Sequence, residues 1–192
     1  SAAFVSEAGF PFFLVTDYFD QTTNTAKVTV SSVPSSADGG VEDLGTFDGM
    51  EPHLAWVPAE NRLYLAHRTL HEPCALRRWD GASWDQVVGP QISAGGACVG
   101  LAVSGDGALV MIARNLPTPA TTELRAYRRV ENGWQDAGRI GPESVGQLLG
   151  VEVGPVGDGL VVSHTDPDAG VAFWTWDGAS SWRHLETVGS AG

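Results

Sequence analysis

The stretch Trp79-Asp80-Gly81-Ala82-Ser83-Trp84 returns near the end of the chain as Trp176-Asp177-Gly178-Ala179-Ser180-Ser181-Trp182. Between the two copies, Trp134 closes a related Asn-Gly turn. The closing tryptophans Trp84, Trp134 and Trp182 are therefore spaced by 50 and 48 residues. A turn sequence that returns at a nearly constant interval indicates a repeated structural unit.

Short apolar segments follow the same period. They open at Leu54, Leu101 and Val151, which are 47 and 50 residues apart. Tight turns such as Gly105-Asp106-Gly107 and Gly157-Asp158-Gly159 separate each of these segments from the next one and suit β-hairpins. The pattern therefore predicts four strands in each repeat. The first two are joined by a tight turn, and the fourth starts at the tryptophan.

Four such repeats account for the whole chain, with approximate boundaries 1–50, 51–98, 99–148 and 149–192. Units of about 48 residues with four strands each are typical of β-propeller blades. The sequence therefore predicts a single all-β domain, a β-propeller with four four-stranded blades. The main alternative is a β-sandwich, which does not require the same turn chemistry at a regular interval.

Strands that crowd a central axis need small side chains, and the alignment places Ala55 and Ala102 at one such position of the innermost strands. The neighbouring positions, such as Leu101 and Val103, are then expected to face the adjacent blades. Glu152 occupies the alanine position in the last repeat, so we expect it to point into a central channel and treat it as a candidate ligand contact.

The composition limits the partners of the chain. Asp and Glu total 23 against 11 Lys and Arg, which gives a formal charge of -12 and argues against nucleic acid as a partner. No apolar run approaches the length of a membrane-spanning helix, so membrane insertion is not expected. The chain also carries none of the short motifs of hydrolases or phosphate-binding proteins, and we expect no metal, no cofactor and no catalytic residues.

The two cysteines, Cys74 and Cys98, fit either one disulfide or two buried thiols. Propeller geometry places both on the same face of adjacent blades, which favours the disulfide slightly. The bridge would contribute on the order of 3 kcal/mol by the loop-entropy model. It would also favour a secreted protein, although the sequence leaves the compartment open.

Polar residues recur where the second strand of each repeat ends. In a propeller these ends lie on one face with the loops that follow them, so their side chains would surround the channel mouth. The predicted ligand contacts, Glu152 included, are Tyr18, His67, Arg68, Arg114, Asn115, Glu152, His164 and Asp166. The alternative is that polar residues simply mark where strands emerge into solvent.

The hairpins that close at the tryptophans resemble a degenerate Asp-box, the Ser-x-Asp-x-Gly-x-x-Trp turn of sialidase-like propellers, which is a folding element in that family. The segments Gly105-Asp106-Gly107-Ala108-Leu109 and Leu124 to Arg129, closing at Gly133-Trp134, are similar to blades of fucose-binding and tachylectin-like lectins. This resemblance implies sugar binding between blades, where an aromatic ring stacks on the sugar, and points to grooves near Trp79, Trp174 and Trp176.

The function predicted from the sequence is a non-catalytic binding module for carbohydrate or protein. The alternative is a glycosidase or lyase of the sialidase-like class. A sialidase needs an arginine triad, but Arg77-Arg78 and Arg128-Arg129 occupy equivalent third-strand positions, and repetition favours a structural role.

The sequence leaves the closure of the ring open. A monomeric four-bladed ring is slightly favoured over a homodimer that forms eight blades and over a chain that is part of a longer protein.

Overall fold

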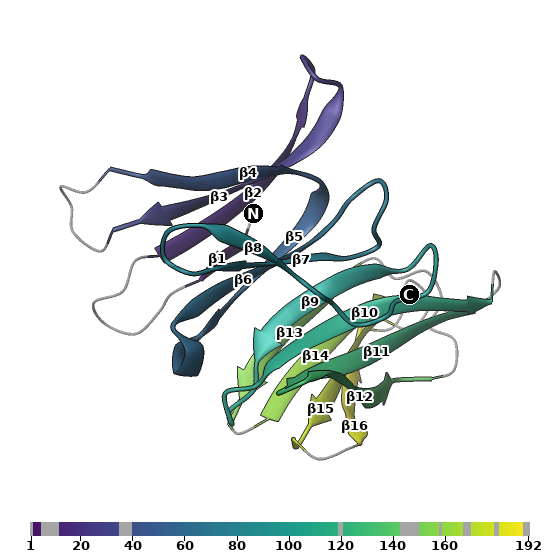
Figure 1. Ribbon diagram of the computed structural model, residues 1–192. Helices are drawn as coiled ribbons and strands as arrows, with labels where there is room; N and C mark the ends of the chain where they lie inside the picture. The colour runs from purple at the N-terminus through teal and green to yellow at the C-terminus, as the bar shows by residue number, and fades with distance from the viewer. Residues whose placement is uncertain are drawn as a thin grey trace. The chain divides into compact units, whose positions relative to one another are not determined.

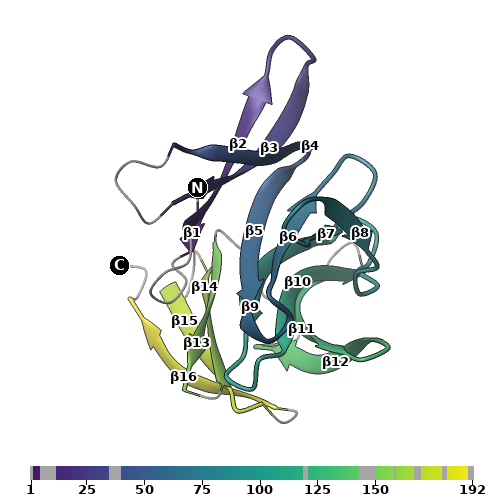
Figure 2. The ribbon, with the colours of Figure 1, turned by 60° about the vertical axis from the view of Figure 1, so that its left-hand side comes forward.

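The protein consists of four antiparallel four-stranded sheets, each formed by four strands in sequence order. The computed structural model describes residues 2–4, 12–34, 40–118, 121–142, 150–157, 159–166, 170–178 and 181–189. The chain divides into two compact units, Ser1–Val87 and Val88–Gly192, with two sheets in each unit (Figures 1 and 2). The prediction of an all-β protein with four four-stranded sheets is confirmed.

The strand bounds are as follows. The first sheet contains β1 (Ala2–Phe4), β2 (Phe12–Asp20), β3 (Thr25–Val33) and β4 (Glu42–Asp48), and the second contains β5 (Met50–Val57), β6 (Arg62–Arg68), β7 (Ala75–Trp79) and β8 (Trp84–Val87). The third sheet contains β9 (Ala97–Val103), β10 (Leu109–Thr118), β11 (Thr121–Val130) and β12 (Gly133–Ile140). The fourth contains β13 (Val151–Val156), β14 (Gly159–Asp166), β15 (Gly170–Trp176) and β16 (Trp182–Val188). A three-residue 3-10 turn, Pro58–Glu60, joins β5 to β6.

The core of the first unit lies between its two sheets. Because side chains alternate between the faces of a strand, Val28 and Val30 point to one side of β3 and are fully buried. The residues that pack with them come from β2, β5 and β6: Phe13, Val15, Leu54, Leu63 and Leu65. Burying a side chain of this size contributes about 1.5 to 3 kcal/mol, so this apolar face holds the pair of sheets together.

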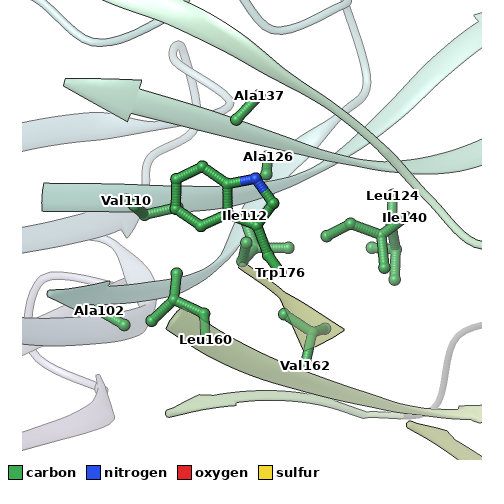
Figure 3. Close-up of a cluster of buried hydrophobic side chains, with 10 residues drawn as sticks. All are labelled: Ala102, Val110, Ile112, Leu124, Ala126, Ala137, Ile140, Leu160, Val162 and Trp176. Atoms are coloured by element: carbon green, nitrogen blue, oxygen red, sulfur yellow. The ribbon is translucent and has the colours of Figure 1, made fainter. Parts of the chain in front are cut away.

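The core of the second unit follows the same plan. The Trp176 indole lies in the middle of a cluster contributed by both sheets, with Val110 and Ile112 from β10 and Leu160 and Val162 from β14 (Figure 3). Trp176 is only 1% exposed, so the last residue of β15 fills the space between the sheets.

Ala102 differs from the prediction that it lines a central axis. It belongs to the cluster between the third and fourth sheets. The physical reason is the two-residue alternation of a strand, which turns successive side chains of β9 to the two faces of its sheet rather than toward an axis. Glu152 is exposed, and its neighbours Val151 and Val153 pack against the core of the second unit from the other face of β13.

The periodic tryptophans share one structural role. Each lies at or next to the start of the fourth strand of its sheet and donates its indole N–H to a backbone carbonyl from the preceding repeat. The bonds run from Trp84 to Leu44 at 2.8 Å, from Trp134 to Val88 at 2.9 Å and from Trp182 to Ala137 at 3.1 Å. The indole packs while its polar N–H is satisfied, as a half-buried tryptophan requires.

Asp80 closes the turn before Trp84. Its Oδ1 accepts hydrogen bonds from the backbone N–H groups of Ala82 and Ser83, at 2.9 and 2.8 Å, and Gly81 has a φ of +103°. These are the bonds of an Asx turn, in which Asp fixes the corner and glycine supplies the positive φ. The Asp-Gly pair of this hairpin therefore has a structural role.

Candidate functional site

The predicted ligand contacts are divided between the two units. Tyr18, His67 and Arg68 belong to the first unit, at or near the ends of β2 and β6. The second unit contains Arg114 and Asn115 on β10, Glu152 on β13, and His164 and Asp166 on β14. The side chain of Asp166 lies outside the described part of the structure.

Burial separates most of these residues into two groups, and Arg114 is intermediate. Tyr18 is 50% exposed, the Arg68 side chain is 39% exposed, and Glu152 is exposed. His67, Asn115 and His164 are buried, with exposures of 0, 6 and 4%. The three buried residues offer little surface in this structure, and contact with a ligand stays a prediction for them as it does for the exposed residues.

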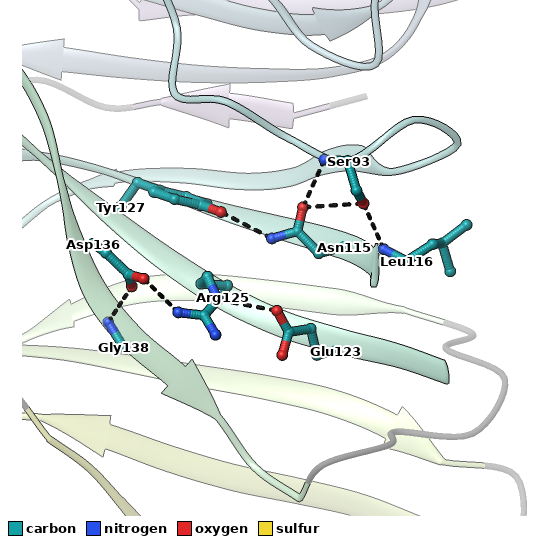
Figure 4. Close-up of polar contacts among 8 residues, drawn as sticks. All are labelled: Ser93, Asn115, Leu116, Glu123, Arg125, Tyr127, Asp136 and Gly138. Atoms are coloured by element: carbon teal, nitrogen blue, oxygen red, sulfur yellow. Dashed lines mark hydrogen bonds and ion pairs between the residues drawn. The ribbon is translucent and has the colours of Figure 1, made fainter. Parts of the chain in front are cut away.

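Asn115 has a structural environment that explains its burial (Figure 4). Its side-chain oxygen accepts a hydrogen bond from the Ser93 backbone N–H at 3.1 Å, and its amide group donates to the Tyr127 hydroxyl at 2.9 Å. The Ser93 hydroxyl in turn accepts from the Leu116 backbone N–H at 2.6 Å. Asn115 therefore fastens the loop around Ser93 to the C-terminal part of β10.

His67 is buried beside two residues of a pocket. Its Nε2 accepts a 3.4 Å hydrogen bond from Arg77 Nε, and its ring centroid lies 5.9 Å from that of Phe47. Burial, followed by the positive charge of Arg77, lowers the pKa of His67 to about 4. His67 is therefore a neutral imidazole at physiological pH, and it positions Arg77. Gly49 makes room for the ring, because a Cβ at this position would collide with Nδ1.

A pocket of the first unit, here called the Phe19 pocket, has a volume of about 620 Å³. It opens where β2 and β6 end, on the face at which the sequence predicts a binding site. Its walls come from the β2–β3 hairpin, the β4–β5 connection, the β6–β7 loop, and β7 and β8. Its lining includes Phe19, Phe47, Asp48, Met50, Leu70, Glu72 and Arg77.

A smaller crevice of about 230 Å³ lies elsewhere in the first unit, beside the 3-10 turn and the β7–β8 hairpin. It combines aromatic side chains with polar groups. We call it the Trp79 crevice after its residues Phe13, Ser32, Glu42, Leu44, Trp56, Asn61, Trp79, Asp80 and Gly81. Of the three tryptophans that the resemblance pointed to, Trp79 lines this crevice.

Sequence reasoning missed most residues of the Phe19 pocket. It chose Tyr18 and Arg68 instead of Phe19 and Arg77. Alternation could have identified Phe19 and Arg77, because Phe19 shares its strand face with the apolar Phe13 and Val15, and Arg77 shares its face with Ala75 and Trp79. Phe47 and Leu70 carry no such pattern, because only the fold brings them to one pocket.

Within the described part of the chain, no group of three or more His, Cys, Asp or Glu side chains is placed to hold a metal ion. No helix among the described residues is long and apolar enough to cross a membrane. The structure contains Cys74 and Cys98 as thiols, Cys74 partly buried just before β7 and Cys98 buried in β9. They lie in different units, so the disulfide stays a prediction, which mass spectrometry of the unreduced, alkylated protein tests.

Comparisons with known proteins identify the fold but no family. No family model and no curated protein matches the sequence. A Hadza microbial sialidase aligns with 98% of this chain at a TM-score of 0.69 and 12% identity. A Dyadobacter fermentans protein of unknown function aligns with 95% at 0.66 and 9% identity, and Trypanosoma rangeli sialidase in complex with sialic acid aligns with 94% at 0.64 and 13% identity.

The present chain spans 46, 67 and 36% of these three solved chains, which is less than half of either sialidase. Sequence identities this low establish fold and nothing about activity. The four sheets therefore constitute a β-propeller fold of the sialidase type.

Proposed function

We propose that this chain is a non-catalytic carbohydrate-binding module and that the Trp79 crevice is its sugar site. The observation that carries the proposal is the combination of side chains in one cavity of about 230 Å³, with Trp79 and Trp56 beside Glu42 and Asn61. One face of a sugar ring presents C–H groups that pack on an indole, while its hydroxyls need fixed donors and acceptors. The cavity has room for a single sugar ring.

The rings of the crevice are held in position before any ligand arrives. Trp56 stacks on Phe13, with ring centroids 5.7 Å apart and an interplanar angle of 22°. The ring centroids of Trp79 and Trp84 are 5.5 Å apart. Trp84 is itself anchored by its hydrogen bond to the Leu44 carbonyl. Preorganised aromatic walls lower the entropic cost of binding, which supports a recognition role.

The polar groups of the crevice favour binding over catalysis. A glycosidase of the usual kind needs one carboxyl group that stays protonated as a general acid, with a raised pKa. Backbone hydrogen bonds from Ser83 and Ala82 instead lower the pKa of Asp80. Asp80 is therefore ionised near neutral pH and committed to its turn, which leaves Glu42 as the exposed carboxylate available to sugar hydroxyls.

A glycan array followed by calorimetry with the best glycan tests the proposal. We expect Glu42→Gln to weaken binding about tenfold, because a hydrogen bond to a charged group is lost. Glu131→Gln, an exposed substitution in the second unit, is the matched control and should leave the affinity unchanged.

Two results would overturn the proposal. The first is an array on which no glycan binds, which favours the protein-recognition alternative, and the second is turnover of chromogenic glycosides, which favours the enzyme. Loss of binding in Arg68→Ala with full binding in Glu42→Gln would place the sugar at the strand ends predicted from the sequence.

A further inference from the structure

The Phe19 pocket differs from the Trp79 crevice in size and chemistry. Its volume of about 620 Å³ falls in the range of sites that enclose a small organic molecule. Two apolar side chains that line it are exposed to water, Phe19 at 59% and Leu70 at 84%. Covering them with an apolar ligand would remove this surface from water, which is favourable in proportion to its area.

Arg77 gives the pocket a positive charge that the protein does not balance. Its guanidinium lies over the Phe47 ring, 4.5 Å from the centroid, and its Nε is used by the neutral His67. Among the described residues no carboxylate forms an ion pair with Arg77. A partly buried charge of this kind is costly unless an anion reaches it.

Other arginines on the third strands of the sheets show the contrast. Arg78, the next residue along β7, pairs with Asp85 at 3.1 Å. Arg128, which corresponds by register to Arg78 in the third sheet, pairs with Asp106. Arg125 on the same strand as Arg128 pairs with Glu123 and Asp136 (Figure 4). Arg77 therefore differs from these arginines in having no carboxylate partner among the described residues, and it lines a pocket.

Two carboxylates also line the pocket, and neither neutralises Arg77. Asp48 forms an ion pair with Lys27, and Glu72 is exposed on the β6–β7 loop. In water an exposed charge is screened over a Debye length of about 8 Å at physiological salt. An anion that reaches Arg77 therefore gains a close, directional contact. The repulsion between this anion and the exposed carboxylate of Glu72 is weakened by the solvent between them.

We propose that the Phe19 pocket binds a small organic acid, with its carboxylate on the Arg77 guanidinium and its apolar body against Phe19, Leu70 and Met50. A guanidinium presents paired N–H donors that match the two oxygens of a carboxylate. This site and this ligand class are independent of the sugar site in the Trp79 crevice.

Calorimetry or ligand-detected NMR with 4-phenylbutyrate tests the charge requirement. The matched neutral probe is 4-phenylbutanol, which keeps the apolar body and loses the carboxylate. We expect the acid to bind saturably and the alcohol to bind about tenfold more weakly, since a charged hydrogen bond is lost. Equal affinity for both probes, or no saturable binding of the acid, overturns the proposal.

Adjacent arginines provide the variant test. Arg77→Met should weaken binding of 4-phenylbutyrate about tenfold or more, whereas Arg78→Met, one residue along the strand, should leave it unchanged. Equal effects of the two substitutions contradict the proposal.

A second variant avoids the folding risk of a change near buried His67. Leu70→Glu alters a side chain that is 84% exposed, so it should fold normally, and it places a negative charge at the pocket mouth. We expect it to reduce affinity for 4-phenylbutyrate severalfold. Leu185→Glu, on exposed β16, is its control and should have no effect. Unchanged affinity in Leu70→Glu places the ligand outside the pocket and overturns the assignment.

Discussion

His67 illustrates how one buried residue links stability to pH. It is fully buried, and the charged group that faces it is Arg77, which repels an imidazolium. Burial, reinforced by Arg77, lowers the pKa from 6.5 to about 4, so the unfolded chain binds a proton more readily than the folded one between these values. Stability from this group is therefore full above about pH 6.5 and is lost as the pH falls toward about 4.

The prediction concerns the pH dependence of unfolding. Over that interval the wild type should lose on the order of 3 kcal/mol more unfolding free energy than His67→Gln, which cannot titrate. Urea unfolding at a series of pH values measures the difference. Parallel pH profiles for wild type and His67→Gln would contradict the burial argument.

At the scale of the element, the repeating unit is a hairpin whose tryptophan is fastened to the preceding repeat. The Trp182 N–H bonds to the Ala137 carbonyl on β12 while its ring stacks on Trp176, with centroids 6.1 Å apart. The hydrogen bond and the ring packing each contribute to the free energy of unfolding. Comparing a substitution that removes only the hydrogen bond with one that removes both measures the two contributions.

We expect Trp182→Phe, which keeps a ring and loses the N–H, to cost about 1 kcal/mol of unfolding free energy. Trp182→Ala loses the packing as well and should cost about 3 kcal/mol or more. Urea midpoints measure both, and Leu185→Ala on the exposed side of the same strand should stay within about 0.5 kcal/mol of wild type. A phenylalanine variant as stable as wild type would mean that the carbonyl bond contributes nothing.

The strands could be predicted from sequence because their determinants are local and repeated. The interval between Trp84, Trp134 and Trp182 and the turn residues between apolar segments are properties of the sequence alone. The partner of each indole could not be predicted, because Leu44, Val88 and Ala137 accept through their backbone carbonyls, a group that every residue carries. The packing of one repeat on the next determines which backbone carbonyl lies within reach of each indole N–H.

The binding sites were less accessible to sequence reasoning for a related reason. Polar residues at strand ends led to His67 and His164, but the structure buries both. Choosing between Arg77 and Arg78 requires knowing which face of β7 each occupies and which carboxylate lies opposite, and Asp85 reaches Arg78 through the β7–β8 register. The walls of the Phe19 pocket include Phe19, Phe47 and Leu70, which are far apart in the sequence. Only the folded chain brings these residues together.

At the scale of the whole molecule, each unit contains a sheet with polar groups on the face opposite its apolar core. On β3, Lys27 and Thr29 lie opposite the face of Val28 and Val30, and they bond to Asp48 and Thr46 of β4. On the fourth sheet, Glu152 and Ser163 are cross-strand partners on the face opposite Val162. A sheet face that carries polar groups of this kind is stable in water without an apolar partner.

We therefore expect the chain to be a monomer, because burying these polar faces against a second copy would remove hydration and bury little apolar surface. Light scattering coupled to gel filtration should give a mass near 20.2 kDa, and the value should not change with protein concentration. A mass near twice that value would support the homodimer that completes an eight-bladed ring and would contradict this argument. In that case Thr29→Asp, which adds a charge to the outer face of β3, should dissociate the dimer if that face is the interface, because an unpaired buried carboxylate is strongly destabilising.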